Sequence, residues 1–341
     1  MKVLATPPDF MEAAEILKDV AEVEVTWEKI GRFRNFTEEE LIRELPKFDG
    51  VVVWLDPLGK KALESVKSKL KVIGVPRAGC DNVDVKTATK LGIPVIYSPG
   101  ANAGAVADHV FGLLLALNRG IVKANTLLKS GRWNGPWAML PGHNLEGKTI
   151  GIVGFGNIGC RVAIRAIGFG MKVIVHDPNL TEDTMTSLML FPKELKVELV
   201  DFKSLLRESD FVTIHVPITE KTFHMIGKDE LALMKESAFL INAARGGIVE
   251  EKSLYEALRK GKISGAALDV FEKEPPNINN PLFRLDNVIV TPHIAWCTYE
   301  AIRRSNMIVA REVTKILSGQ PQNIRYLANP QVLGYSRTNR M

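Results

Sequence analysis

Three polar residues in the second half of the chain each follow an apolar stretch that is typical of a buried strand. Arg245 follows FLINAA, Glu274 follows GAALDVFEK, and His293 follows NVIVTP. Open α/β sheets bind ligands at the carboxyl ends of their strands, so we expect these side chains to meet at one edge. An imidazole moves protons near neutral pH, a carboxylate orients that ring, and a guanidinium holds a substrate carboxylate in two hydrogen bonds. Each residue alone is more often structural, but their joint placement favours oxidation of a small 2-hydroxy acid.

A glycine turn between Thr149 and Asp177 predicts where the hydride acceptor binds. The sequence TIGIVGFGNIGCRVAIRAIGFGMKVIVHD is typical of a strand, a turn, a helix, a second strand and an acid. Gly154 permits the tight turn, Gly156 lets a pyrophosphate approach the backbone, and Gly159 lets the helix pack closely on the strand. Free N–H groups at the start of the helix attract phosphate, and Asp177 is placed to accept hydrogen bonds from a ribose. Because a carboxylate there repels the extra phosphate of NADP, the motif predicts NAD.

Strands and helices alternate along both halves of the chain, which predicts an α/β protein with two doubly wound parallel sheets. The expected strands are 2–5, 23–27, 51–55, 72–75 and 95–97 in the first unit, and 149–154, 172–176, 211–216, 239–242, 266–268 and 288–291 in the second. A final helix over 299–317 has no strand left to cover in the second unit. We therefore expect it to cross back and pack on the first.

Composition and charge exclude several classes of protein. The 341 residues are 46% hydrophobic and 24% charged, which suits a globular protein of two domains. The net charge of +5 comes from scattered residues rather than a basic run, so we expect no nucleic-acid partner. The apolar stretch 110–117 is too short to span a membrane, and the first residues do not resemble a secretory signal. Three widely spaced cysteines, Cys80, Cys160 and Cys297, favour reduced thiols in the cytoplasm and no metal site.

A long apolar helix is predicted over 103–119. Its apolar residues cover a broader stripe than one core contact requires: Val106, Val110, Leu113, Leu114 and Leu117. Burial between the two domains and burial in a homodimer interface explain this stripe equally well, and both stay open at this point.

In combination, the motifs resemble those of the D-isomer-specific 2-hydroxyacid dehydrogenases, a family that includes phosphoglycerate dehydrogenases and glyoxylate or hydroxypyruvate reductases. The resemblance covers nearly all of residues 70–325 and rests on the glycine turn, HVPIT, NAARGG, LDVFEKEP and TPHIA. It implies a Rossmann NAD domain, 102–294, inserted in a flavodoxin-like substrate-binding domain formed by 1–101 and 295–325, with a tail over 326–341. It also implies an oxidoreductase that transfers a hydride between NAD(H) and C2 of a small anionic D-2-hydroxy or 2-keto acid, usually as a homodimer formed through the long helix over 103–119.

The same resemblance assigns the site residues. Arg245 matches the residue that binds the substrate carboxylate and carbonyl, and His293 with Glu274 matches the acid–base pair. The implied cofactor contacts are Val106, Gly154, Gly156, Asn157, Ile158, Gly159, Asp177, Pro217, Ala243, Ala244, Arg245, Asp269 and His293. Among these, Asp269 would meet the nicotinamide carboxamide. The implied substrate contacts are Arg77, Ala78, Gly79, Arg245 and His293, with backbone N–H groups of Ala78 and Gly79 on the carboxylate.

Several features depart from the family pattern. The loop VPRAGCDNVD is two residues shorter than its counterpart in phosphoglycerate dehydrogenases, so Arg77 is either a contact for a second anionic group or a surface charge. Trp133 and Trp137 lie in a segment that reaches a partner's active site in some reductases of the family, with packing as the alternative. The stretch 326–341 extends past the family's usual end, and we expect it to be weakly ordered or to contact a partner.

Two other functions are possible on this fold. NAD-sensing transcriptional corepressors share this fold and even carry the same catalytic trio, which is Arg245, Glu274 and His293 here. Nothing in residues 1–100, however, identifies a peptide-docking surface. Formate dehydrogenases carry glutamine at the position of Glu274, which argues against that activity.

Overall fold

The structure is a computed structural model that describes residues 1–26, 35–66, 69–133, 142–180 and 197–334. The chain divides into two units. Unit 1 is Met1–Asn102 with Cys297–Met341, and unit 2 is Ala103–Trp296. The expected crossings between the domains, after residues 101 and 294, differ by one and two residues from these limits, whereas the expected boundary after residue 325 has no counterpart.

Unit 1 is built on a parallel five-stranded sheet in the order β2-β1-β3-β4-β5. This is the flavodoxin-like order. The strands are β1 (Lys2–Ala5), β2 (Glu22–Val25), β3 (Gly50–Val52), β4 (Val72–Val75) and β5 (Val95–Tyr97). Val3 and Ala5 face one hydrophobic cluster while Leu4 faces another, because successive side chains of a strand point to opposite faces. Both faces of the sheet are therefore buried.

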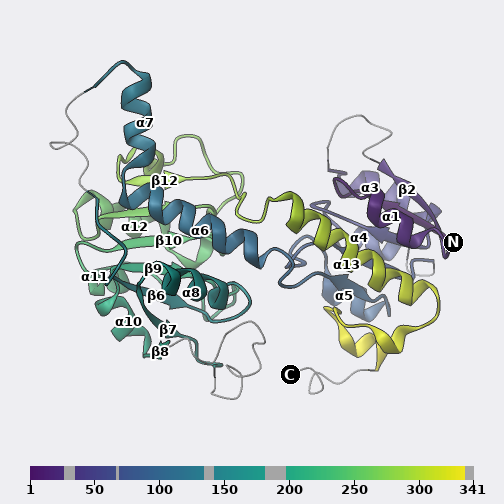
Figure 1. Ribbon diagram of the computed structural model, residues 1–341. Helices are drawn as coiled ribbons and strands as arrows, with labels where there is room; N and C mark the ends of the chain where they lie inside the picture. The colour runs from purple at the N-terminus through teal and green to yellow at the C-terminus, as the bar shows by residue number, and fades with distance from the viewer. Residues whose placement is uncertain (27–34, 67–68, 134–141, 181–196, 335–341) are drawn as a thin grey trace. The chain divides into compact units, whose positions relative to one another are not determined.

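Helices cover both faces of this sheet (Figure 1). They are α1 (Met11–Leu17), α3 (Glu38–Glu44), α4 (Lys60–Ser65), α5 (Val85–Lys90) and α13 (Tyr299–Leu317), with short 3₁₀ turns at Leu45–Lys47, Pro321–Asn323 and Pro330–Leu333. As expected, α13 crosses back to unit 1. There Asn306 donates to the carbonyl of Pro8 (2.9 Å), and Arg303 donates to Glu12 (2.6 Å) on α1.

The start of the expected C-terminal tail differs from the expectation, because it packs firmly on β5. Leu327 is buried and pairs with Ile96 in an isolated antiparallel bridge. Asn329 is fully buried and bonds to the N–H of Val95 (2.8 Å) and the carbonyl of Ile93 (2.9 Å). Residues 326–333 are thus part of unit 1, whereas 335–341 lie outside the described residues.

Unit 2 is built on a parallel seven-stranded sheet in the order β12-β11-β10-β9-β6-β7-β8. Counted from β6, this is the Rossmann order with one added strand. The strands are β6 (Thr149–Val153), β7 (Lys172–His176), β8 (Glu198–Leu199), β9 (Phe211–Ile214), β10 (Phe239–Asn242), β11 (Gly265–Leu268) and β12 (Val288–Val290). The prediction of two doubly wound parallel sheets is confirmed; among the residues that the structure describes, only the two-residue edge strand β8 was missed.

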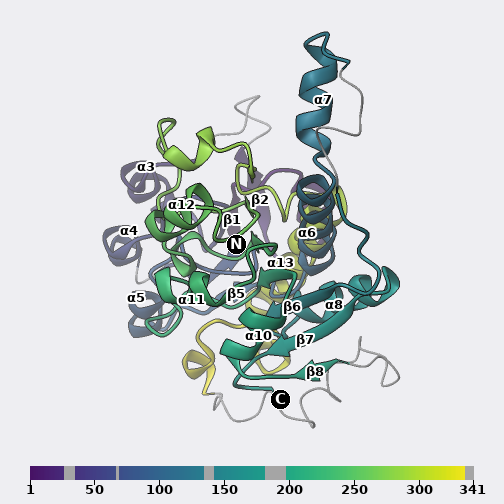
Figure 2. The same ribbon diagram turned by 90° about the vertical axis from the view of Figure 1, so that its left-hand side faces the viewer.

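The helices of unit 2 also lie on both faces of their sheet (Figure 2). They are α6 (Ala103–Asn118), α7 (Ile121–Lys129), α8 (Gly159–Gly168), α10 (Phe202–Glu208), α11 (Lys228–Leu233) and α12 (Glu251–Arg259), with 3₁₀ turns at Gly246–Ile248 and Pro281–Arg284.

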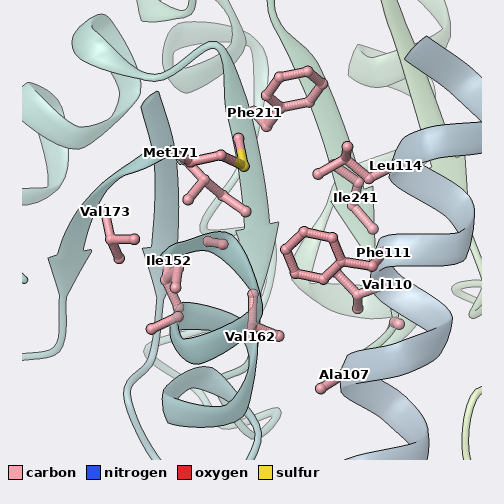
Figure 3. Close-up of a cluster of buried hydrophobic side chains, with 14 of the residues drawn as sticks. Ala107, Val110, Phe111, Leu114, Ile152, Val162, Met171, Val173, Phe211 and Ile241 are labelled. Atoms are coloured by element: carbon pink, nitrogen blue, oxygen red, sulfur yellow. The ribbon is translucent and has the colours of Figure 1, made fainter. Parts of the chain in front are cut away.

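The apolar stripe of α6 is explained by unit 2 itself. Val110, Phe111 and Leu114 are buried in one cluster with Ile152 of β6 and Ile241 of β10 (Figure 3). The stripe is broad because α6 covers the sheet and also packs beside α8. Neither of the two explanations left open from the sequence is needed for these side chains.

Helix α7 differs from α6 in having no buried residue, and it stands out from the rest of unit 2 (Figures 1 and 2). In the part of the chain that the structure describes, no single helix is long and apolar enough to cross a membrane. Helices α6 and α7, which are bent by 62° at their junction, reach the length and apolar composition of a membrane-spanning segment only when the two are counted as one.

Candidate active site

The predicted site residues of unit 2 follow strands at the carboxyl edge of its sheet. Chain order reverses between β6 and β9, and ligands of doubly wound sheets bind at such a switch point. The glycine turn follows β6, Asp177 follows β7, and Pro217 comes after β9. Arg245, Glu274 and His293 come after β10, β11 and β12 in turn.

The glycine turn has the shape that a dinucleotide pyrophosphate requires. Gly154 has φ of 95°, and a Cβ there would lie 2.9 Å from the carbonyl group of His215. A Cβ on Gly159 would overlap the carbonyl oxygen of Gly154, whereas one on Gly156 would meet nothing within 4 Å. The N-cap position of α8, Ile158, makes no side-chain cap. Open space in front of an uncapped helix N-terminus suits the phosphates of a dinucleotide.

Backbone N–H groups, one of them in the glycine turn, hold the side chain of Asp177 in place. Its Oδ2 accepts from the N–H of Phe155 (2.9 Å), and its Oδ1 accepts from the N–H of Asn179 (2.9 Å). A carboxylate oxygen accepts about two hydrogen bonds, so each oxygen keeps a place for a ribose hydroxyl. The fixed negative charge suits NAD and opposes a ribose phosphate.

Glu274 and His293 form a direct pair. The Oε2 atom of Glu274 lies 2.7 Å from Nδ1 of His293, and its Oε1 accepts from the N–H of Phe271 (3.1 Å). Burial raises the pKa of the Glu274 carboxyl, but the hydrogen bonds from His293 and Phe271 and the charges of His293 and Arg245 outweigh it and hold that pKa below its usual range. An ionised carboxylate only accepts, so Nδ1 carries the proton toward Glu274 and Nε2 is left for a substrate.

Arg245 lies beside this pair on the neighbouring strand end. It is half-buried, its Nη1 donates to the carbonyl of Ala244 (2.8 Å), and its charge helps to lower the pKa of Glu274. The next residue, Gly246, packs its backbone against the peptide group between Phe271 and Glu272. The structure therefore brings the three predicted catalytic residues together.

Asp269 anchors the turn that carries His293. Its fully buried carboxylate accepts from the N–H groups of Ile294 (2.9 Å) and Ala295 (2.8 Å) and from the hydroxyl of Thr291 (2.5 Å). His109 of α6 approaches the same place, with Nε2 3.1 Å from Oγ1 of Thr291. From the sequence, Asp269 is expected only as a carboxamide contact. The roles of Thr291 and His109 were not predicted, because nothing in the α6 pattern marks one histidine as facing another strand.

The other implied contacts are dispersed around this edge. Asn157 and Pro217 are exposed, Ile158 is half-buried, and Ala243 and Ala244 are each 8% exposed. Val106 is buried in the α6 cluster (Figure 3 shows its neighbours Ala107 and Val110). The segment Arg77–Gly79 belongs to unit 1, so its placement beside the trio stays a prediction. Trp133 is 80% exposed, and Trp137 lies outside the described residues.

The charge of His215 and the possibility of a metal ion are two further questions about this site. His215, which follows β9, places Nε2 2.9 Å from Oγ1 of Thr213, and burial lowers its pKa to about 3, so it stays neutral. Within the described ranges, no group of three or more histidine, cysteine, aspartate or glutamate residues could hold a metal ion.

Comparison with known proteins agrees with this geometry. Residues 111–295 match the family model of the D-isomer specific 2-hydroxyacid dehydrogenase NAD binding domain. The chain is 43% identical to D-3-phosphoglycerate dehydrogenase of Methanocaldococcus jannaschii over 94% of its own length and 58% of that protein. It is 40% identical to hydroxypyruvate reductase of Thermotoga maritima over 93% of its length and 98% of that protein. D-Lactate dehydrogenase of Aquifex aeolicus, solved with NAD and lactic acid, superposes with a TM-score of 0.81 at 29% identity, over 96% of this chain and 99% of that one.

The matches cover different shares of the two relatives' lengths. The chain spans 58% of the length of the phosphoglycerate dehydrogenase but nearly all of the hydroxypyruvate reductase. The matched domain contains the glycine turn, Asp177 and the Arg–Glu–His group whose geometry is given above. The chain belongs to the D-isomer-specific 2-hydroxyacid dehydrogenase family, and residues 111–295 are its NAD-binding domain.

Proposed function

We propose that this chain transfers a hydride between NAD(H) and C2 of a small D-2-hydroxy or 2-keto acid, and that in cells it acts as a 2-keto acid reductase. The observation that carries the proposal is the 2.7 Å contact between Glu274 and Nδ1 of His293 beside Arg245. Bound NADH supplies the hydride. Family membership and the names of the relatives support the reaction class, with glyoxylate, hydroxypyruvate and 3-phosphohydroxypyruvate as candidate substrates.

Each residue of the trio has a role that its surroundings favour. Arg245 binds the substrate carboxylate and polarises the carbonyl oxygen at C2, because a guanidinium donates two parallel hydrogen bonds to such groups. His293 gives a proton from Nε2 to that oxygen as C2 gains the hydride, and it takes the proton back in the reverse direction. Glu274 keeps the imidazole in the required tautomer and stabilises its charged form. The resemblance also assigns the backbone N–H groups of Ala78 and Gly79 to the substrate carboxylate, and Arg77 is either a contact for a second anionic group or a surface charge.

The cofactor site is assigned in the same way. The N–H groups at the start of α8 hold the pyrophosphate, and Asp177 accepts from the adenosine ribose. Gly156, Asn157 and Ile158 line the phosphates. The nicotinamide contacts are Val106, Pro217, Ala243, Ala244, Arg245, Asp269 and His293. The assignment of Asp269 to the carboxamide rests on the resemblance to the family, because its carboxylate is fully buried and its Oδ2 accepts from the N–H of Ala295 (2.8 Å).

The test is NADH oxidation by the purified chain with glyoxylate, hydroxypyruvate and 3-phosphohydroxypyruvate, compared by kcat/KM. Activity is expected with at least one of them. His293→Ala should lower kcat by about 100-fold or more, the usual contribution of a general acid. Arg245→Ala should lower kcat/KM similarly. His143→Ala and Arg259→Ala, at exposed positions in the same unit, are the matched controls.

The competing function is an NAD-binding sensor without catalysis. Tight NADH binding with no turnover of any of these acids would favour the sensor and contradict the proposal. Unchanged turnover in His293→Ala and Arg245→Ala would instead contradict the assigned roles while leaving the reaction class intact.

A homodimer is part of the proposal. Helix α7 presents exposed apolar side chains, Ile121 (53%), Val122 (50%) and Leu128 (55%), and an open groove of about 670 Å³ lies between α7 and the β12 edge. Exposed apolar groups of this size favour burial against a second copy. Light scattering should give twice the chain mass, and Ile121→Asp with Val122→Asp should shift it toward the monomer. A monomeric wild-type chain would contradict the dimer.

A cytoplasmic location is the last part of the proposal. Cys80, Cys160 and Cys297 are all free thiols. Free cysteines suit a reducing compartment. Fractionation of cells that express the tagged chain would test this, and recovery in a secreted fraction would contradict it.

A further inference from the structure

We propose that Trp296 is a positioning residue for His293, and that it acts through its indole N–H rather than through the bulk of its ring. The inference rests on the proposed function for its kinetic consequence only. It assigns a role to a residue outside the Arg–Glu–His group, three positions after the histidine that would move the proton.

The backbone of His293 has an unfavourable conformation. Its φ is 54°, in the left-handed region that residues with a Cβ seldom adopt. Glycine would adopt this conformation readily, but the position requires an imidazole, so neighbouring groups must stabilise it. The conformation directs the ring to Glu274, and a relaxed turn would change the 2.7 Å contact between Nδ1 and the carboxylate.

Hydrogen bonds hold the peptide groups on both sides of His293. On the amino side, the N–H of His293 donates to the carbonyls of Asp269 (2.8 Å) and Thr291 (3.1 Å). On the carboxyl side, the carbonyl of His293 accepts from Nε1 of Trp296 (2.8 Å). Asp269 also holds the following N–H groups through its side chain. Trp296 is therefore the side chain that fixes the carbonyl of His293 itself.

The surroundings of Trp296 make this contact firm. The ring is partly buried and packs against the hydrophobic cluster that contains α6, next to the buried Ala295. A ring held on its apolar side has little freedom to turn its N–H away, and a hydrogen bond shielded from water is stronger than an exposed one. All these groups belong to unit 2.

Two substitutions separate the donor from the bulk. Trp296→Phe keeps an aromatic ring of useful size but has no N–H. Trp296→His loses more apolar volume, yet its Nε2 stands at the same position relative to Cβ as the indole Nε1 and can donate. If the N–H matters, the histidine variant works better; if only packing matters, the phenylalanine variant works better. Tyr299→Phe, which removes a hydroxyl from a side chain that is 85% exposed, is the control.

The kinetic experiment measures kcat and KM of the full chain with NADH and its best 2-keto acid, at a pH where an added histidine is neutral. Trp296→Phe should lower kcat by about threefold to tenfold, the effect of one hydrogen bond, with the Kd of NADH unchanged. Trp296→His should recover most of this loss. A phenylalanine variant as active as the histidine variant, or more active, would overturn the inference.

A second measurement does not depend on turnover. Proton NMR should show a downfield signal from Nδ1–H of His293 bonded to Glu274 in the wild-type chain, identified by its absence from Glu274→Ala. In Trp296→Phe this signal should move or broaden while the melting temperature stays close to that of Tyr299→Phe. An unchanged signal would contradict the positioning role. If the wild-type chain turned over no 2-keto acid, the proposed function would fail, and this signal would still decide the role of Trp296.

Discussion

Gly246 and Phe271 touch through their backbones. The Cβ that Gly246 lacks would overlap the carbonyl carbon and oxygen of Phe271 and come 2.5 Å from the N–H nitrogen of Glu272. Gly246 follows Arg245, and the peptide of Phe271 begins the loop that ends in Glu274. This backbone contact therefore helps to position both Arg245 and Glu274, and it leaves no space for a side chain at position 246.

We predict that Gly246→Ala disrupts the site because the contacting atoms are backbone and cannot rotate away. The loop from Phe271 to Glu274 must shift, so kcat/KM should fall by more than about tenfold and the melting temperature should drop. Steady-state kinetics and thermal unfolding measure both. Gly247→Ala is the matched control, since its nearest neighbour is the ring of Phe223 at 3.3 Å, which can move aside. Equal activity in the two alanine variants would contradict the prediction.

The ionised state of Glu274 should be visible in the dependence of stability on pH. Its pKa is lower in the folded protein than in the unfolded chain. The stabilisation is therefore present above the unfolded pKa and is lost as pH falls through the folded one. The difference in melting temperature between wild type and Glu274→Gln should shrink on acidification through this range. It should be modest, because the side chain is 36% exposed.

The control for this pH dependence is Glu300→Gln, at an exposed position in the first turn of α13. Burial lowers the pKa of His215 to about 3, so its protonation in the unfolded chain also reduces stability on acidification, but wild type and variant share this contribution and it cancels in the difference. A difference that grew on acidification would reverse the sign and contradict a lowered pKa for Glu274.

Asp177 should determine the choice of dinucleotide. Asp177→Ser removes the charge that opposes a ribose phosphate and also weakens the hold on the adenosine ribose. The ratio of kcat/KM for NADH over NADPH should fall by about tenfold to 100-fold, the effect of one to two hydrogen bonds and one charge. Asp286→Ser, at an 86% exposed side chain in the same unit, should leave the ratio unchanged. A ratio equal to wild type in Asp177→Ser would show that other groups select NAD.

The sequence predicted those features that are marked by a short motif or by a regular pattern of apolar residues. The glycine turn, Asp177 and the three residues proposed as catalytic each lie in a short motif at a strand end, and α13 was predicted at its observed bounds, Tyr299–Leu317. The fold class followed from the alternation of strands and helices, and the strand orders confirm it.

What the sequence did not reveal depends on contacts between distant segments. His109 reaches Thr291 across 182 positions, and Asn329 reaches Val95 across 234. Neither residue belongs to a motif, and polar residues on a helix face or near a chain end are usually solvated. The surface that buries the apolar stripe of α6 was not predicted for the same reason, because periodicity shows that a face is buried but not which surface buries it.

The segment after Leu327 should contribute to the stability of unit 1. Asn329 is fully buried, accepts from the N–H of Val95 (2.8 Å), and donates to the carbonyl of Ile93 (2.9 Å) and the hydroxyl of Thr89 (3.2 Å). Asn329→Ala leaves a buried N–H and a buried carbonyl without these partners. The free energy of unfolding should fall by about 2–4 kcal/mol, since each unsatisfied group costs about 1–3 kcal/mol.

Urea unfolding measures this loss, with Gln331→Ala as the control because Gln331 is exposed two positions further along the same segment. The trio lies in unit 2, so the fraction of Asn329→Ala that remains folded should bind NADH with the wild-type Kd. A midpoint equal to that of Gln331→Ala would show that residues 326–333 rest on β5 without holding it. A weakened NADH affinity at full folding would show that the effect reaches beyond unit 1.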